Sequence, residues 1–220
     1  MEEGIRSAID AAGKDGVVVI FGSLYLAGAV RTVFQDRQRE EKKTQRRAAR
    51  AARRELTDEQ RAAKSAVICE KLKALPEIRD AKTIVSYLAL WDEVDLAAFD
   101  AWAVAEGKRV AYPVCGKRGQ MEFYFPSSRE EMLVDGYGIV TPDPEKSERL
   151  DPSALDVMLV PMVAFDSSMR RMGQGGGYYD RYLIRCPEAK HIAVAFSEQE
   201  VPHVVTEAFD MPMDMVITDR

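Results

Sequence analysis

The sequence has few of the residues that build disulfide frameworks, metal clusters or flexible linkers. Its three cysteines lie far apart with no Cys-x-x-Cys spacing, which argues against a disulfide framework or structural zinc site and favours a reducing compartment. The two histidines, His191 and His203, are not spaced as metal ligands. With 14 glycines, 10 prolines and 46% hydrophobic residues in 220, the chain is expected to form one main core with a small appendage.

Long apolar runs are also missing. The longest covers residues 17–30 and is interrupted by Gly22, Ser23 and Gly28, whereas a membrane-spanning helix needs roughly 20 apolar residues. The N-terminus before this run is acidic and lacks the arrangement of a signal peptide. We therefore expect a soluble, cytoplasmic protein with no membrane partner.

Positive charge is concentrated in one segment. Residues 37–54 hold nine basic residues against two glutamates, a net charge of +7, whereas the whole chain carries −5. Such a run is typical of a solvated helix face and less often of a nucleic-acid patch. The acidic remainder disfavours nucleic acid, so none is expected as a partner, although an RNA-binding helix on an α/β body stays as one alternative.

A boundary between two segments is expected near residue 37. Residues 1–36 are predicted to form a helix–strand–helix appendage, with Ile5 and Ile9 on one helical face, a buried strand at 17–21 and a second helix opened by Gly22 and Ser23. Such a unit cannot bury its strand alone.

Residues 37–220 are predicted to form the main domain. An Ala-rich helical stretch comes first, and a capping box of Thr57 and Gln60 begins the next helix, which Pro76 ends. Strands are then expected at residues 83–90, 109–113, 121–125, 155–161, 192–196 and 215–218, and helices at 96–106 and 178–186. Apolar strands separated by helices predict an α/β fold with a mostly parallel sheet covered on both faces, which binds ligands at the carboxyl ends of its strands.

The most informative segment is residues 165–183, in which Gly173, Gly175, Gly176 and Gly177 immediately precede a helical stretch. Bare backbone N–H groups and the positive helix end can converge there on a phosphate. The segment is not a Walker A motif, because no Gly-Lys-Ser/Thr follows, and it is not a Gly-x-Gly-x-x-Gly fingerprint.

Charged side chains flank these glycines. Arg170 and Arg171 add charge-assisted hydrogen bonds for a phosphate, and Asp180 is placed to hold a magnesium ion that bridges phosphates. The alternative is an ordinary flexible loop in which Asp180 is a carboxylate of the first helical turn.

Two stretches, residues 160–166 (VPMVAFD) and 171–183 (RMGQGGGYYDRYL), resemble the signature of the 5-formyltetrahydrofolate cyclo-ligase family, also called methenyltetrahydrofolate synthetases. The resemblance extends over roughly residues 40–220. It implies a three-layer α/β/α sandwich that uses ATP and Mg²⁺ to convert 5-formyltetrahydrofolate to 5,10-methenyltetrahydrofolate, with release of ADP and phosphate.

The resemblance also assigns site residues by their place in the motifs. Those implied for ATP are Lys42, Arg46, Arg171, Met172, Gly173, Gln174, Gly175, Gly176, Gly177, Tyr178 and Tyr179. Those implied for the folate are Leu88, Glu93, Tyr178 and Tyr179. Asp180 and Asp214 are implied to hold the magnesium.

Three positions depart from the family pattern. Gln45 stands where leucine is usual, and Gln174 where an aromatic or basic residue is common. Phe209 and Asp210 stand where the family often has a His-Asp pair. We expect none of these changes to abolish activity.

The implied chemistry needs positioning and charge rather than a protein nucleophile. Phosphorylation of the formyl oxygen by ATP makes that oxygen a good leaving group, and N10 then closes the ring. Cations and backbone amides supply the field for the phosphates, and an ionised Glu93, which only accepts hydrogen bonds, suits pterin N–H groups. A folate- or nucleotide-binding protein without turnover is the alternative from another class.

A second resemblance is confined to the first segment. Residues 15–31 resemble the final strand and helix of folylpolyglutamate or dihydrofolate synthases. The nucleotide loop and catalytic centre of those enzymes are absent from this sequence, so no such ligase activity is implied. The arrangement predicts a fusion to an upstream folylpolyglutamate synthase, or a gene start assigned within one.

Overall fold

The computed structural model describes residues 2–13, 16–21, 24–128, 131–136 and 138–220. The chain divides into two compact units, Met1–Gln45 and Arg46–Arg220. The helix α2 (Leu24–Arg54) is continuous through the boundary expected near residue 37, because neither glycine nor proline interrupts it after Gly28. None of the helices in the described ranges has the length and apolar character that a bilayer span requires.

The first unit is built on the predicted helical face. Helix α1 (Glu2–Ala12) buries Ile5 and Ile9, which cluster with Val33 of α2. Arg37 on α2 also forms an ion pair with Asp10 on α1, at 2.8 Å.

The strand expected at residues 17–21 is not formed. These residues are irregular, and the side chains of Val17 and Phe21 are 85% and 87% exposed. A strand must pair its backbone groups with a neighbour, and no strand is found among the described residues of this unit. The expected helix start at Gly22 and Ser23 lies outside the described residues.

The second unit is organised around a seven-stranded sheet in the order β11-β10-β7-β1-β2-β3-β6. The strands are β1 (Thr83–Val85), β2 (Arg109–Cys115), β3 (Met121–Phe125), β6 (Glu148–Arg149), β7 (Val157–Pro161), β10 (Lys190–Val194) and β11 (Met215–Ile217). Pairing from β11 to β2 is parallel, whereas β3 and β6 are antiparallel. The expectation of a mostly parallel sheet is confirmed.

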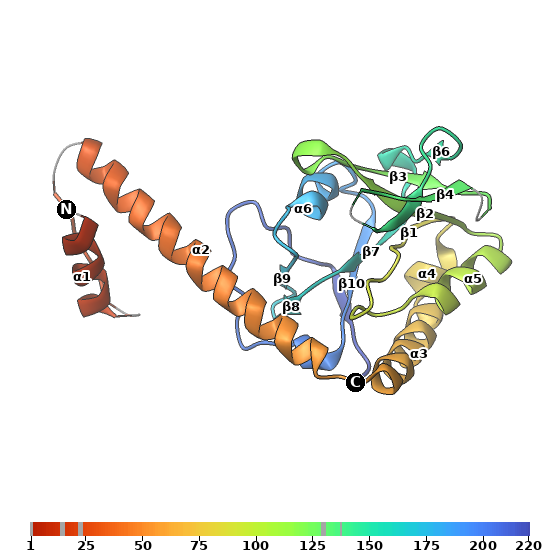
Figure 1. Ribbon diagram of the computed structural model, residues 1–220, viewed down its shortest axis with the longest axis horizontal. Helices are drawn as coiled ribbons and strands as arrows, with labels where there is room; N and C mark the ends of the chain where they lie inside the picture. Colours follow the sequence, from red (N-terminus) through yellow and green to blue (C-terminus); the bar gives the residue numbers. More distant parts are fainter. Residues whose placement is uncertain (1, 14–15, 22–23, 129–130, 137) are drawn as a thin grey trace. The chain divides into compact units, whose positions relative to one another are not determined.

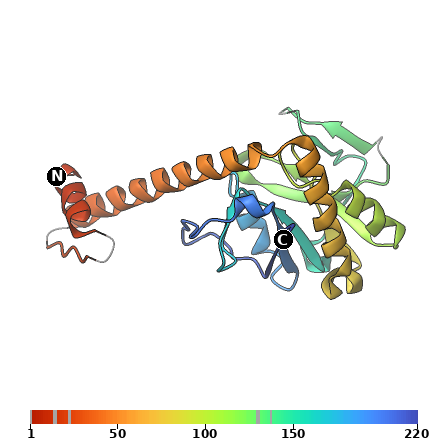
Figure 2. The ribbon, with the colours of Figure 1, turned by 90° about the horizontal axis from the view of Figure 1, so that it is seen from below.

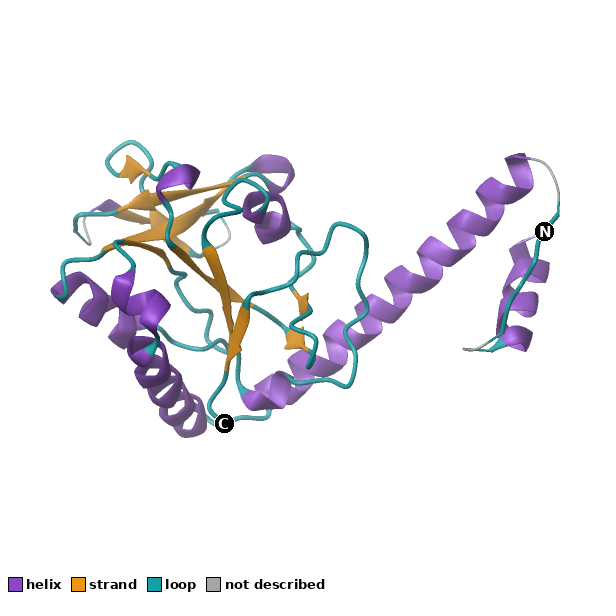
Figure 3. Cartoon of the chain, turned by 180° about the vertical axis from the view of Figure 1, so that it is seen from behind, coloured by secondary structure: helices purple, strands orange, loops and turns teal. Residues whose placement is uncertain are grey.

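Alternate residues of the central strands enter two different cores. Ile84 and Leu159 pack with helices α3 (Asp58–Ala74), α4 (Pro76–Asp80) and α5 (Ala97–Ala105). Val85 and Met158 pack on the other face with α6 (Tyr178–Leu183). Figures 1 and 3 show these layers, and Figure 2 shows α3 lying against the sheet. The expected α/β/α layering is therefore present, since strands covered on both faces are apolar on both.

Local signals set several element ends. The capping box is present, because Thr57 accepts a hydrogen bond from the Gln60 N–H and the Gln60 side chain accepts one from the Thr57 N–H. Helix α3 ends before Pro76, which is the first residue of α4. Two hairpins complete the unit: β4 (Met132–Val134) with β5 (Val140–Pro142), and β8 (Ala164–Phe165) with β9 (Arg171–Met172).

Two elements are shorter than expected. Strand β1 stops at Val85 rather than residue 90, because the chain leaves the sheet and the buried Tyr87 donates its hydroxyl hydrogen bond to the Val94 carbonyl. Helix α6 stops at Leu183 rather than residue 186, in a turn where the Cys186 N–H bonds the Leu183 carbonyl.

The sheet contains a topological switch point between β1 and β7. The chain passes from β1 to its neighbour β2 on one side and from β7 to β10 on the other. Connections that diverge in this way leave a crevice at the carboxyl ends of the two strands. The loop after β1 and the loop after β7 are therefore the first places to look for a site.

Candidate active site

The hairpin after β7 carries the glycine-rich loop, residues 173–177. Asp166, which is 2% exposed, accepts hydrogen bonds from the backbone N–H groups of Ser168, Arg170 and Val204. Although burial opposes ionisation, these backbone bonds lower the pKa of Asp166. The ionised Asp166 carboxylate thus ties the turn between β8 and β9 to the backbone at Val204.

Glycine is required in the loop itself. Gly175 has φ +105° and Gly177, the N-cap of α6, has φ +64°, and both lie in the region that L side chains rarely adopt. A Cβ at Gly176 would lie 2.6 Å from the Tyr178 ring. The loop therefore exposes main chain where a side chain would crowd it.

The last turns of α2 line the loop with arginines. Arg46 Nε donates to the Gly173 carbonyl at 2.9 Å, and one helical turn later Arg50 donates to the Gln174 carbonyl at 3.4 Å. Between them Ala49 packs against Met172. Lys42, one turn before Arg46, is in the first compact unit.

These arginines are close enough to perturb one another. Burial, and then the positive charges of Arg46, Arg53 and Arg54, lower the pKa of Arg50. A concentration of positive charge of this kind favours an anionic ligand.

The predicted Arg171 and Asp180 are brought together. The Arg171 side chain is 2% exposed, and its guanidinium lies 2.6 Å from Asp180 Oδ1. The same oxygen accepts the Met211 N–H at 3.2 Å. Arg171 Nε is buried and has no hydrogen-bond partner in the described part of the chain.

Asp214 is placed differently. It precedes β11, and its Oδ2 accepts the His191 N–H at 2.8 Å, at the amino end of β10. In the described ranges no contact joins its carboxylate to Asp180, and no cluster of three or more histidine, cysteine or acidic side chains has metal-ligand geometry.

Glu93 lies in the loop after β1 and is anchored from three sides. Its Oε2 accepts the Leu90 N–H at 3.1 Å, and its Oε1 accepts Gln174 Nε2 at 3.2 Å. Arg53 Nη1 is 3.8 Å from Oε1. The structure thus joins the glutamate predicted for the folate to the loop predicted for ATP. Leu88, half-buried, lies in the same loop as Glu93.

Arg53 is a residue of the site that the sequence did not single out. It is 2% exposed and donates to the Met162 carbonyl after β7 at 3.3 Å, while its other terminal nitrogen lies 2.9 Å from Asp92 after β1. It therefore bridges the two loops at the switch point. In the sequence Arg53 is one of nine basic residues between 37 and 54, so composition does not distinguish it. Its spacing of seven residues from Arg46 does place both arginines on one helical face.

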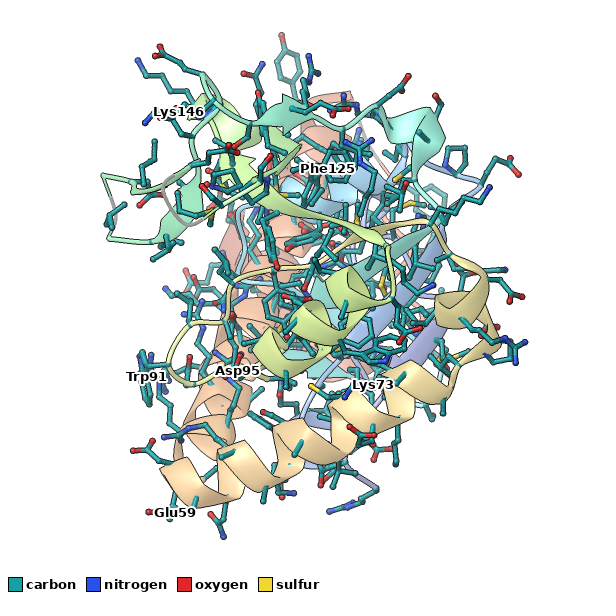
Figure 4. The ribbon with its side chains drawn as sticks, turned by 90° about the vertical axis from the view of Figure 1, so that its right-hand side faces the viewer. Glu59, Lys73, Trp91, Asp95, Phe125 and Lys146 are labelled. Carbon is teal, nitrogen blue, oxygen red and sulfur yellow. The ribbon has the colours of Figure 1, made fainter. Side chains whose placement is uncertain are left out.

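Asp92 is held ionised by this arrangement. Burial opposes the charge, but the hydrogen bonds and charges of Arg53 and Arg54 lower the pKa of Asp92. The adjacent Trp91 is 66% exposed, and the guanidinium carbons of Arg54 and Arg61 each lie 5.4 Å from its ring centroid. Figure 4 shows Trp91 projecting outward from the loop that contains it.

The two tyrosines after the glycines differ in environment. Tyr178 donates a long hydrogen bond to the Gly116 carbonyl at 3.5 Å. Tyr179 packs 6.4 Å from the Phe123 ring. Burial, together with the negative charge of Glu93, raises the pKa of Tyr179 well above its usual value, so its hydroxyl remains protonated as a hydrogen-bond donor.

A pocket of about 220 Å³ lies beside the Arg171–Asp180 pair. It is lined by Arg170, Arg171, Thr206, Glu207, Asp210, Met211 and Pro212. The departure at Phe209 and Asp210 therefore falls at this pocket: Asp210 lines it, and Phe209 is 81% exposed.

The chain is similar to a known protein family and to three of the proteins found by comparison. The model of the 5-formyltetrahydrofolate cyclo-ligase family matches residues 38–219. The 5-formyltetrahydrofolate cyclo-ligase of Escherichia coli K12 is 30% identical over 173 residues, covering 77% of this chain and 95% of its own length.

Two solved structures share the fold. The 5,10-methenyltetrahydrofolate synthetase of Aquifex aeolicus is 31% identical with a TM-score of 0.71, covering 81% of this chain and 90% of that one. The synthetase of Mycoplasma pneumoniae is 23% identical with a TM-score of 0.67, covering 81% of this chain and 99% of that one.

Proposed function

Because the chain belongs to the 5-formyltetrahydrofolate cyclo-ligase family, we propose that it converts 5-formyltetrahydrofolate and ATP to 5,10-methenyltetrahydrofolate, ADP and phosphate. The observation that carries this proposal is the meeting of Glu93 with Gln174 at the switch-point crevice. It places a carboxylate suited to pterin N–H groups next to a main-chain loop suited to phosphates.

In the proposed reaction the formyl oxygen attacks the γ-phosphorus of ATP, and ADP leaves. N10 then adds to the activated formyl carbon, the C–O bond breaks, and phosphate departs with that oxygen as N10 loses its proton. The chain's part is to align the reactants and to stabilise negative charge on the transferred group. No side-chain nucleophile is needed.

The phosphate-binding groups are assigned from the loop and its neighbours. We assign Lys42, Arg46, Arg171 and the backbone of residues 172–179 to ATP. Support comes from the glycine requirement at Gly175 and Gly176 and from the buried Nε of Arg171, which has no hydrogen-bond partner among the described residues. A buried guanidinium with a free donor suits an anion, because an unmade hydrogen bond there is costly.

The residues present fit a magnesium ion that accompanies ATP. Magnesium prefers carboxylate oxygens and usually binds through one or two of them plus phosphates and water. Within the described residues both hydrogen bonds to Asp180 use Oδ1, which leaves Oδ2 for a cation. We propose Asp180 as the ligand that would hold the ion, which would there neutralise phosphate charge. Asp214, which the resemblance also implies, holds the His191 N–H at the amino end of β10, and among the described residues no contact joins it to Asp180, so the geometry supports only Asp180 as a ligand.

The folate-binding groups are assigned to the opposite side of the same crevice. We propose that Glu93 accepts hydrogen bonds from the pterin ring, with Leu88, Tyr178 and Tyr179 lining its pocket. Support comes from the anchoring of Glu93, which fixes its position before substrate arrives, and from the protonated hydroxyl of Tyr179.

Turnover separates this proposal from a folate- or nucleotide-binding protein without activity. The purified chain is mixed with 5-formyltetrahydrofolate and MgATP, and formation of the methenyl product is followed by absorbance. Product formation that depends on ATP is expected. Binding of both ligands without product would replace the proposal with the non-catalytic alternative.

Two expectations about the rest of the chain remain proposals. We propose a cytoplasmic location, from the three unpaired cysteines. We also propose that residues 1–36 are a folylpolyglutamate synthase-like segment joined to the cyclo-ligase domain. The match to the cyclo-ligase family begins only at residue 38. The exposed side chains of Val17 and Phe21 suit a segment that has no strand to pair with among the described residues.

A further inference from the structure

The side chain of Gln174 is held between two charged groups. Its Nε2 donates to Glu93 Oε1 at 3.2 Å, and its Oε1 accepts a hydrogen bond from Arg50. Arg50 also donates to the Gln174 backbone carbonyl at 3.4 Å. The residue is exposed, so these bonds and not burial fix its position.

Chemistry determines which way the Gln174 amide points. Arg50 has only donors, so it must face the amide oxygen, and the Glu93 carboxylate has only acceptors, so it must face the NH₂ group. The reversed amide would place donor against donor and acceptor against acceptor. In the hydrogen bonds that link Arg50, Gln174 and Glu93, the donor and the acceptor of each bond are therefore fixed.

Gln174 lies between Gly173, whose carbonyl Arg46 holds, and Gly175, which has φ +105°. Any ligand that orders this stretch of backbone also fixes the origin of the Gln174 side chain. Gln174 makes the one hydrogen bond within 3.5 Å to Glu93 Oε1 among the described residues, and Arg53 adds an ion pair to the same atom at 3.8 Å. Order at the loop is thus transmitted to the carboxylate by one side chain.

We propose that Gln174 is a positioning residue that couples nucleotide binding to folate binding. A triphosphate bound to the loop restrains residues 173–175 further, which strengthens the hold that Gln174 already has on Glu93 Oε1, and the pterin then meets a carboxylate with less freedom to move. This inference rests on the proposed function. It predicts positive coupling between the two ligands, and linkage requires that each ligand tighten the other by the same factor.

The coupling is measured by titration calorimetry. The Kd of 5-formyltetrahydrofolate is determined with and without a saturating, non-hydrolysable ATP analogue and magnesium, for the wild type and for Gln174→Ala. We expect the analogue to tighten folate binding roughly five-fold or more in the wild type and less than about two-fold in Gln174→Ala. The reverse titration must return the same factor.

Two further variants separate coupling from general damage to the loop. Gln174→Glu keeps the shape and the acceptor for Arg50 but turns the donor facing Glu93 into a like charge, so we expect it to lose the coupling and weaken folate binding further. Gln120→Ala removes an exposed glutamine whose side chain has no hydrogen bond in the described ranges, and we expect it to keep the wild-type factor.

The outcomes distinguish this inference from the function on which it rests. A wild type that binds neither ligand, or forms no product, overturns the proposed function. A wild type that turns over but shows no coupling, or a Gln174→Ala variant that keeps it, overturns the role of Gln174 and leaves the proposed function standing.

Discussion

Arg53 is the buried cation that faces both carboxylates beneath the site. It lies 2.9 Å from Asp92 and 3.8 Å from Glu93, and all three side chains are less than a tenth exposed. Breaking a buried pair by removing one partner is costly because the remaining charge has neither water nor counter-ion. Arg53 therefore matters both to stability and to the orientation of Glu93.

We expect Arg53→Met to lower the free energy of unfolding by about 3–5 kcal/mol, as measured by urea denaturation. It should also raise the KM for folate, because Asp92 and Glu93 both lose the buried cation that lies between them. The matched control is Arg47→Met, an exposed arginine of the same helix, which should change stability by less than about 0.5 kcal/mol. Adding Asp92→Asn to Arg53→Met should restore part of the loss, and no restoration would argue against the charge explanation.

A buried carboxyl group, that of Asp100, lies away from the site on α5. Burial raises the pKa of Asp100 to about 7, and the hydrogen bond that Tyr112 donates to it at 3.0 Å opposes this shift only in part. Between about pH 4 and pH 7, the Asp100 carboxyl therefore stays protonated in the folded protein, whereas in the unfolded chain it has already released its proton. Stability is highest with this carboxyl protonated and falls as pH rises from about 4 to about 7.

We expect Asp100→Asn to remove this pH dependence. The difference in unfolding free energy between variant and wild type should grow in favour of the variant from about pH 4 to pH 7, by up to about 4 kcal/mol. Thermal or urea unfolding across that range measures it. Asp80→Asn, an exposed control, should show no such trend, and a flat difference for Asp100→Asn would show that its carboxyl is already charged at low pH.

The sequence predicts the site residues that lie together in one short motif. It does not predict those whose role depends on contacts between distant parts of the chain. The glycines, Arg171 and Asp180 stand in one short segment, and the structure places them together. Arg53 and Asp92 are 39 residues apart in sequence, and only the fold brings them into contact. Among the nine basic residues of 37–54, nothing local distinguishes the buried Arg53 from the more exposed arginines.

Among the elements of the site, the glycine-rich loop restricts both the backbone conformation and the space for a side chain. Gly176 does not have a positive φ, so a substitution there tests space rather than backbone strain. A side chain would meet the Tyr178 ring, so the ring or the loop must shift. We therefore expect the proposed phosphate site to be distorted without loss of the fold.

We expect Gly176→Val to raise the KM for ATP roughly ten-fold or more while leaving the melting temperature nearly unchanged. Gly136→Ala is the control, because a Cβ there meets nothing within 4 Å. Steady-state kinetics with varied ATP and circular dichroism measure the two effects. Unchanged ATP kinetics in Gly176→Val would remove the loop from the nucleotide site.

The elements were predictable where a periodic pattern and a terminal signal agreed. The capping box began α3, and apolar runs located the strands of the sheet. The strand expected at residues 17–21 failed because an apolar β-branched run specifies a strand only when a neighbour is available to pair with it. Likewise β1 ended early because Tyr87 is satisfied by Val94 in the loop.

At the scale of the whole molecule, each hydrophobic core belongs to one compact unit. The cluster of Ile5, Ile9 and Val33 lies within residues 1–45. The clusters around the sheet and around Ala49 use residues from 49 onward. A core built entirely from one part of the chain should fold without the other part.

We therefore expect a chain beginning at Arg37, with an initiating methionine added, to keep the α/β/α core and cyclo-ligase activity. The truncation retains Lys42 and the α2 residues that contact the loop, and it removes the exposed 17–21 segment. Its melting temperature should stay within about 4 °C of the full chain, with a similar kcat. A chain beginning at Arg54, which removes Lys42, Arg46, Arg50 and Arg53, is the contrasting truncation and should lose ATP-dependent turnover. Activity in the second truncation would show that α2 contributes nothing to the site, and inactivity of a folded first truncation would show that residues 1–36 take part in it.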